Sequence, residues 1–272
     1  MQVAVAGGLA HEAYAYTGGK PFDPNPPCVV FVHGALHDHS IWTLLARWYA
    51  NHGYGVLAPD LPGHSNRGDG TPLATVEAIA DWLNALLDAA NVASAAIVGL
   101  SMGSLVALEA AARRPERTRH LVMMGTAYPM TVSPALLDAA RRDPLAAIDS
   151  VNAFSHSTIA AKPAFPGPGS WLHGGNRVLM RRLQAARDDT NLFVTDFEAC
   201  NRYRGALEAA TRVRCPATVI VGKSDQMTLP AQAIDLAAAL KARVVTLPSG
   251  HSLTSEVPDL LLGALIEALP RR

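Results

Sequence analysis

The sequence predicts an α/β fold, in which a mostly parallel β-sheet is flanked by helices. Three observations carry this prediction. Short, continuously apolar runs bounded by Gly, Pro and Asp recur along the chain, and longer segments with helical apolar spacing lie between them. The third is that the chain has 272 residues, of which 49% are hydrophobic and 17% charged, so it can bury a large core. Continuously apolar runs are typical of parallel strands covered on both faces.

The predicted strands follow one another at intervals that suit right-handed crossovers through helices. Near the N-terminus, the segments Gln2–Ala6 and Glu12–Thr17 are expected to form an antiparallel hairpin at the sheet edge. The buried strands are expected at Cys28–Val32, Gly55–Ala58, Ala95–Gly99, His120–Met124, Ala217–Val221 and Arg243–Leu247.

Helices are predicted between these strands. Apolar residues recur at helical spacing from Val76 to Leu87. A second helix is expected over Met102–Arg114, where Pro115 stops it. Pro230 suits a first helical turn that leads into Ala231–Leu240, and Leu260–Leu269 closes the chain.

The alternation of strands and helices stops over residues 128–212. More than 80 residues separate two consecutive predicted strands here, which is far beyond ordinary crossover length. We therefore predict a core formed by residues 1–127 and 213–272, with residues 128–212 inserted as a helical cap. The segments with helical character are Ser133–Arg142, Leu145–Phe154, Arg177–Arg187 and Phe193–Ala210, interrupted by a Pro/Gly-rich stretch at residues 162–169.

Composition excludes several classes of protein. Lys+Arg and Asp+Glu both number 23, so no basic excess favours nucleic acid. Cys28, Cys200 and Cys215 are too few and too scattered for a disulfide framework or a zinc site. No apolar run approaches the ~18 residues of a membrane span, and Met1–Gly19 lacks the pattern of a signal peptide. We expect a cytoplasmic protein acting on a small molecule, with no preference between monomer and homo-oligomer.

A Gly-x-Ser-x-Gly pattern, Gly99 to Gly103, follows one predicted strand and opens a helix. A serine on such a sharp turn exposes its hydroxyl above the sheet, which predicts Ser101 as a nucleophile. A serine hydroxyl needs a base to take its proton, and His251, just after the last predicted strand, is the candidate. Asp225 follows the preceding strand and would orient the imidazole of His251. The order Ser, Asp, His, each just past a strand, predicts a catalytic triad at the edge where open α/β sheets bind ligands.

A tetrahedral intermediate also needs hydrogen-bond donors for its oxyanion. Gly34, after the first buried strand, allows a tight turn that aims the N–H of Ala35, or that of Leu36, at the site; the N–H of Met102 is the second predicted donor. His33, His37 and His39 nearby lack an acidic or cysteine partner at a zinc-like spacing, so no metal is predicted.

These motifs resemble those of the α/β-hydrolase superfamily over essentially the whole chain. His33-Gly34 resembles its oxyanion loop, Pro59–Ser65 its Asp-x-x-Gly-x-Gly/Ser turn, and Trp42 an aromatic residue of its first helix. The resemblance implies an eight-stranded, mostly parallel sheet with a helical cap between strands six and seven. Two departures narrow the function: the chain lacks the Gly-Gly-Gly-Pro-Gly run of carbon–carbon bond hydrolases, and position 101 is not the aspartate of dehalogenases and epoxide hydrolases.

The leading hypothesis is a serine hydrolase that cleaves a carboxylic ester of a small or medium substrate, without a cofactor. A carbon–carbon bond hydrolase, a lactonase or an acyltransferase with the same triad remains open, as does a ligand-binding, receptor-like protein with little turnover. We expect the substrate to contact apolar or amphipathic side chains of the cap and of the oxyanion loop, namely Leu36, Met130, Phe154, Phe165, Trp171 and Tyr203.

Overall fold

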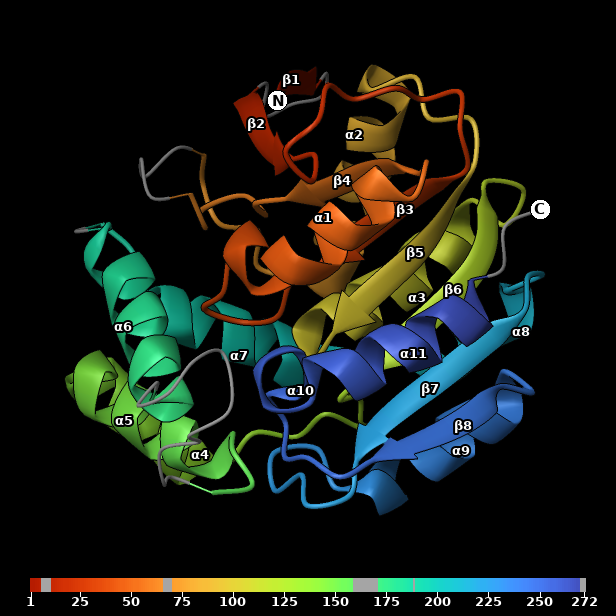
Figure 1. The fold of residues 1–272 in the computed structure, drawn as a ribbon. Helices are drawn as coiled ribbons and strands as arrows, with labels where there is room; N and C mark the ends of the chain where they lie inside the picture. The colour runs from red at the N-terminus through yellow and green to blue at the C-terminus, as the bar shows by residue number, and fades with distance from the viewer. Residues whose placement is uncertain (6–10, 66–69, 159–170, 188, 270–272) are drawn as a thin grey trace.

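A computed structural model describes residues 1–5, 11–65, 70–158, 171–187 and 189–269 of the chain. In this part of the chain eight strands form one sheet, ordered β1-β2-β4-β3-β5-β6-β7-β8 (Figure 1). The pairs β1–β2 and β2–β4 are antiparallel and all other pairs are parallel, which confirms the predicted hairpin and sheet. The bounds are β1 Gln2–Val5, β2 His11–Tyr16, β3 Cys28–Val32, β4 Gly55–Pro59, β5 Ala95–Leu100, β6 Thr118–Met124, β7 Ala217–Gly222 and β8 Arg243–Leu247.

Both faces of the parallel strands are apolar, because alternate side chains of a strand point to opposite faces. On β3, Val30 and Val32 belong to one core cluster, whereas Val29 and Phe31 belong to another. Helices α2 (Val76–Ala89), α3 (Met102–Arg113), α8 (Ala206–Arg212) and α9 (Ile234–Ala239) cover the first face, and α1 (Thr43–Asn51) and α11 (Pro258–Ala268) cover the second (Figure 1). The sheet therefore lies inside a three-layer core that holds its strand ends in fixed positions.

Helices α2, α3 and α11 have nearly the predicted extents, whereas no range was predicted for α1 or for α10 (Leu253–Glu256). The helix expected over Ala231–Leu240 begins instead as a short 3-10 helix, η2 (Pro230–Ala233). A second 3-10 helix, η1 (His39–Trp42), precedes α1, and the side chain of Asp38 caps it by accepting a hydrogen bond from the Ser40 amide.

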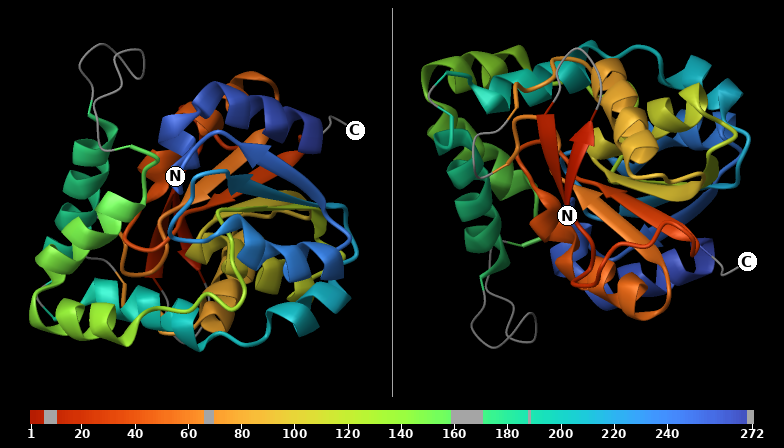
Figure 2. Two further views of the ribbon diagram at one scale, coloured as in Figure 1. Left: turned by 90° about the horizontal axis from the view of Figure 1, so that it is seen from below. Right: turned by 90° about the horizontal axis from the view of Figure 1, so that it is seen from above.

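Between β6 and β7 the chain forms α4 (Pro134–Arg142), α5 (Pro144–Phe154), α6 (Leu172–Ala185) and α7 (Leu192–Arg202) before it reaches α8. We call α4–α7 the inserted helices. They lie together beside the carboxyl ends of the parallel strands (Figures 1 and 2), and α7 also contacts α3. They share a cluster of buried apolar side chains, to which Leu36 of the loop after β3 also belongs. The division into a core and a cap domain stays a prediction.

Two details differ from the sequence prediction. The helical segment expected over Phe193–Ala210 is divided into α7 and α8, because the backbone is extended at Tyr203, whose hydroxyl donates a hydrogen bond to Glu109 on α3. Helix α6 begins at Leu172, earlier than the apolar spacing indicated. Among the described residues, no helix has both the length and the apolar character needed to span a membrane.

Candidate active site

Ser101 occupies the sharp turn between β5 and α3. Its φ angle is 55°, in the left-handed region that non-glycine residues rarely adopt. The turn packs so tightly that a Cβ atom at Gly99 would lie 2.0 Å from the carbonyl oxygen of Gly103, and one at Gly103 would lie 2.3 Å from the carbonyl oxygen of Val32. Glycine is required at both positions, and the turn presents Ser101 to a cavity at the sheet edge.

His251 and Asp225 form a buried pair across the ends of β8 and β7. His251 Nδ1 donates to Asp225 Oδ2 at 2.8 Å, so Nε2 is the nitrogen left to accept a proton. Burial raises the pKa of the Asp225 carboxyl, but the charge and hydrogen bond of His251 and the hydrogen bonds of Thr228 lower it further, to below its ordinary value. Asp225 is therefore held as a carboxylate, the state that can orient an imidazole.

Thr228 completes this pair, and sequence reasoning missed it. Its hydroxyl donates to Asp225 Oδ2 at 2.7 Å and lies 3.1 Å from His251 Nδ1. The amides of Met227 and Thr228 donate to the other carboxylate oxygen at 2.8 and 2.9 Å. A threonine three residues after the aspartate is the signal that would have indicated this turn.

Ser101 and His251 line the same cavity, although they come from opposite ends of the sequence. The end of β6 packs beside the imidazole, since a Cβ atom at Gly125 would lie 3.1 Å from His251 Cε1 and Nδ1. Within the described residues Ser101 Oγ makes no hydrogen bond. Such bonds are commonly long before substrate binds, so the arrangement is compatible with proton transfer in a complex.

The loop after β3 lies directly against Ser101. A Cβ atom at Gly34 would lie 3.1 Å from the Cβ atom of Ser101, and Ala35 lines the cavity. The role of Ala35 as an oxyanion donor stays a prediction. Met102 provides the first amide of α3, which has no carbonyl partner within the helix. The alternative donor, Leu36, is wrong because its N–H donates to Asp196 Oδ2 at 2.9 Å.

The histidines of this loop make protein contacts. Nε2 of His33 accepts a hydrogen bond from the Leu61 amide, and Nδ1 lies 2.8 Å from the carbonyl oxygen of Gly34. Burial lowers the pKa of His33 well below its ordinary value. His33 is therefore neutral. His37 lies between the carbonyl oxygen of Ala35 and Asn176 Oδ1, at 2.7 and 2.8 Å.

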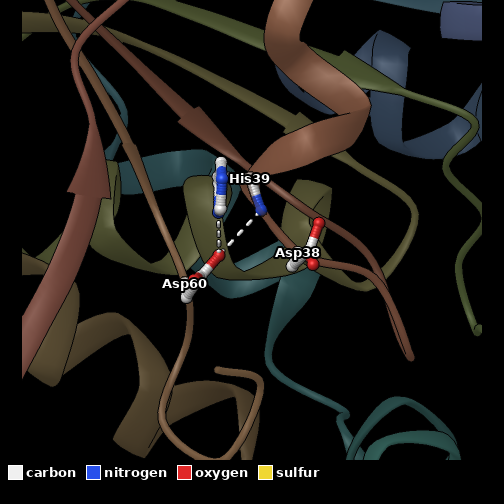
Figure 3. Close-up of side chains that lie close together, drawn as sticks. All are labelled: Asp38, His39 and Asp60. Carbon is white, nitrogen blue, oxygen red and sulfur yellow. Dashed lines mark hydrogen bonds and ion pairs between the residues drawn. The ribbon is translucent and has the colours of Figure 1, made fainter. Parts of the chain in front are cut away.

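Asp38, His39 and Asp60 bring their ligand-type atoms within 4.8 Å of one another (Figure 3). Asp60 Oδ1 accepts hydrogen bonds from the backbone N–H and the ring Nδ1 of His39, at 2.8 and 2.7 Å. Asp38 accepts from Ser40 through one oxygen and from Arg182 through the other. Oδ1 of Asp60 and both oxygens of Asp38 are thus hydrogen-bonded within the protein, one of them to a guanidinium, so this cluster is better explained as a structural junction.

The cavity has a volume of about 600 Å³, within the usual range for small-molecule sites. One wall comes from η1 and α1, and the opposite wall from α5, α6 and α7. Its apolar lining residues are Ile41, Leu44, Leu45, Leu100, Val151, Trp171, Leu172, Leu179, Met180, Phe197 and Met227.

Of the side chains predicted to contact substrate, Trp171 lines this cavity, whereas Leu36, Met130, Phe154 and Tyr203 do not. Leu36 is fully buried among the inserted helices, and Met130 is buried in the core. Tyr203 is buried with its hydroxyl bound to Glu109, and Phe154 projects into solvent outside the cavity. Phe165 lies outside the described residues. Sequence reasoning also missed Asn176, because the predicted helix begins only at Arg177.

Comparison with known proteins agrees with this architecture. Residues 29–264 match the Alpha/beta hydrolase family. An esterase of Mycobacterium tuberculosis is 26% identical over 255 residues, which cover 87% of this chain and 80% of that protein. A pimeloyl-[acyl-carrier protein] methyl ester esterase of Aromatoleum aromaticum is 38% identical over 104 residues, but the match covers only 38% of each protein. The crystal structure of an enol-lactonase from Burkholderia xenovorans has a TM-score of 0.79 and 23% identity, with 98% of each chain covered.

Proposed function

This chain belongs to the alpha/beta hydrolase family, and from that premise we propose that it is a serine hydrolase of carboxylic esters. One observation carries the proposal: a serine on a strained strand-to-helix turn shares a cavity with His251, whose Nδ1 is bound to a buried carboxylate, Asp225. A protein that only binds ligands has no need of an activated hydroxyl.

The proposed reaction has two halves. Ser101 Oγ attacks the ester carbonyl carbon while its proton passes to His251 Nε2, and the amides of Ala35 and Met102 bind the oxyanion. The imidazolium then protonates the departing alkoxide, which leaves an acyl-enzyme on Ser101. Water, deprotonated by His251, attacks the acyl carbon, and the second tetrahedral intermediate releases the carboxylic acid and restores the serine hydroxyl. These steps use only the chain's own groups and water.

The cavity supports a substrate of small or medium size with apolar character. Several polar groups that line it are already bound within the protein: Ser155 Oγ donates to the carbonyl oxygen of Val151, Ser255 Oγ donates to that of Ser252, and His37 contacts Asn176. The remaining surface is largely aliphatic and aromatic. We propose that residues 128–212 act as the cap that selects the substrate, and that the protein works in a reducing, cytoplasmic setting, where its cysteines remain thiols.

The direct test compares the wild type with Ser101→Ala on chromogenic esters of increasing acyl length, with lactones, amides and vinylogous diketones as further substrates. We expect ester turnover by the wild type, a fall of at least about 10⁴-fold in kcat for the variant, and an unchanged circular dichroism spectrum. A fluorophosphonate should add one equivalent of mass to the wild type and none to the variant.

Full ester turnover by Ser101→Ala would overturn the mechanism. A burst of one equivalent of product followed by negligible turnover would favour a receptor-like protein instead. Faster reaction with lactones or diketones than with esters would keep the triad but change the substrate class.

A further inference from the structure

A carboxylate from the inserted helices reaches into the core directly behind the predicted oxyanion donor. Asp196, on α7, is 1% exposed and its Oδ2 atom accepts two hydrogen bonds. One comes from the Leu36 amide at 2.9 Å, and the other from His64 Nε2 at 2.8 Å. Three segments that are far apart in the sequence therefore meet at one oxygen atom: the loop after β3, the loop after β4, and α7.

The hydrogen-bond geometry favours the charged form of His64. Its Nε2 faces the Asp196 carboxylate and its Nδ1 lies 3.1 Å from the carbonyl oxygen of Pro62, so acceptors stand at both ring nitrogens. Only an imidazolium can donate to both. Burial lowers the pKa of His64, but the charge of Asp196 and the hydrogen bonds raise it above the ordinary value. Neutral His33 lies beside it, with the ring centroids 4.9 Å apart.

Charged pairs buried this deeply are costly to assemble, and removing one partner leaves an uncompensated charge. The oxygen that neutralises His64 is the same one that binds the Leu36 amide. The position of that amide is thus set by a rigid, charged acceptor and not by solvent or by a mobile side chain.

The backbone around Leu36 needs such a constraint. Leu36 has a φ angle of 52°, which is unfavourable for a leucine and persists only where the surroundings impose it. Ala35 lies between this anchored amide and Gly34, which is pressed against Ser101. Both neighbours of Ala35 are therefore fixed, one by Ser101 and the other by Asp196.

We propose that Asp196 is a positioning residue for the oxyanion hole. Held in place by protonated His64, it anchors the Leu36 amide and so aims the N–H of Ala35 at the cavity. The inserted helices then contribute to the chemical step as well as to the walls of the cavity. This inference rests on the proposed function, because the Ala35 amide matters only if an oxyanion forms there.

A second ion pair between the same two regions provides a control. Arg182, on α6, donates to Asp38 Oδ2 at 2.8 Å, also across the boundary between the inserted helices and the core. Asp38 makes its other contacts with Ser40, and none with the backbone of Ala35 or Leu36. Arg182→Gln removes a tie between the same regions but leaves the Leu36 amide anchored.

The test measures kcat and KM on a short ester for Asp196→Leu, Asp196→Ala, Asp196→Asn and Arg182→Gln, each normalised to the sites titrated by a fluorophosphonate. It also measures the affinity of an arylboronic acid, which forms a tetrahedral adduct with an active serine. Loss of a whole oxyanion donor costs about 100- to 1,000-fold, so a misaligned donor should lower kcat by about 10- to 100-fold in the Leu and Ala variants, with KM nearly unchanged.

Boronate affinity should fall by the same factor, because both quantities depend on the oxyanion donors. Asp196→Asn keeps an oxygen that can accept from the Leu36 amide, so its kcat should recover to within about threefold of the wild type. Arg182→Gln should match the wild type in kcat and in boronate affinity.

Wild-type kcat per titrated site in Asp196→Leu and Asp196→Ala would overturn the proposal, and so would lowered kcat with unchanged boronate affinity. If neither variant yields titratable sites, Asp196 serves folding and the proposal also fails. A wild type that the fluorophosphonate does not label would instead refute the proposed function, whatever the Asp196 variants do.

Discussion

The carboxyl edge of the sheet and the inserted helices hold their cavity-lining groups by different means. At the sheet edge, backbone geometry fixes Ser101, Asp225 and His251, because each directly follows a strand of a continuous parallel ladder. The inserted helices are not part of the sheet. Side-chain contacts join them to the loop after β3, through Asp196, Arg182 and Asn176. The sheet thus positions the reacting side chains by itself. The inserted helices depend instead on a few separate polar contacts with the core, both for the walls of the cavity and for the proposed alignment of the Ala35 N–H.

A substitution at the carboxyl edge of the sheet should cause the largest loss of activity. Asp225→Asn keeps the shape of the side chain but removes the charge that stabilises an imidazolium and favours the wrong tautomer of His251, so kcat should fall by about 10⁴-fold on a short ester. Asp235→Asn, an exposed aspartate on α9, is the matched control and should leave kcat unchanged. If kcat of Asp225→Asn fell by less than about tenfold, the orientation of His251 would depend on Thr228 instead.

Trp171, at the start of α6, should affect substrate selectivity and not the chemical step. Trp171 and Phe154 are 51% and 53% exposed, but only Trp171 lines the cavity. Trp171→Ala should raise KM for a long-chain ester by about tenfold, because apolar contact is lost, and should leave KM for an acetate ester unchanged. Phe154→Ala should change neither. Equal effects of the two substitutions would show that the long acyl chain does not follow this wall.

The smallest expected effect is on stability and concerns the ion pairs between α5 and α6. Hydrogen bonds from Arg177 and Arg181 lower the pKa of the Asp149 carboxyl to about 2. A lowered carboxyl pKa stabilises the folded state above the ordinary value of 3.8, and this contribution disappears as the pH falls through about 2. Asp149 is partly exposed, so solvent screening limits the effect.

Asp149→Asn should therefore lower the unfolding temperature by less than about 3 °C at pH 7, as measured by circular dichroism. The difference from the wild type should vanish near pH 2. A difference that persists at that pH would assign it to packing and not to the ionised carboxylate.

The contrast between the two regions also explains what the sequence predicts well. Ser101, Asp225 and His251 follow apolar runs, and a parallel sheet brings the ends of such runs to one edge, so local pattern is enough to place them. Most of the predicted substrate contacts failed for the opposite reason. A positive φ turns Leu36 into the inserted helices, and Tyr203 is drawn toward Glu109. Asp196 acts through partners in other segments, which no spacing within its own segment reveals.

The shared oxygen of Asp196 limits how freely this protein can be recombined. Transplanting the segment between β6 and β7 into another enzyme of the same architecture would carry over walls that suit one substrate. Unless the recipient also has a histidine after its fourth strand and a backbone N–H in register, the graft would place an unneutralised carboxylate beside the donor of another active site. Chimaeras designed on substrate shape alone should therefore lose turnover before they lose the ability to bind.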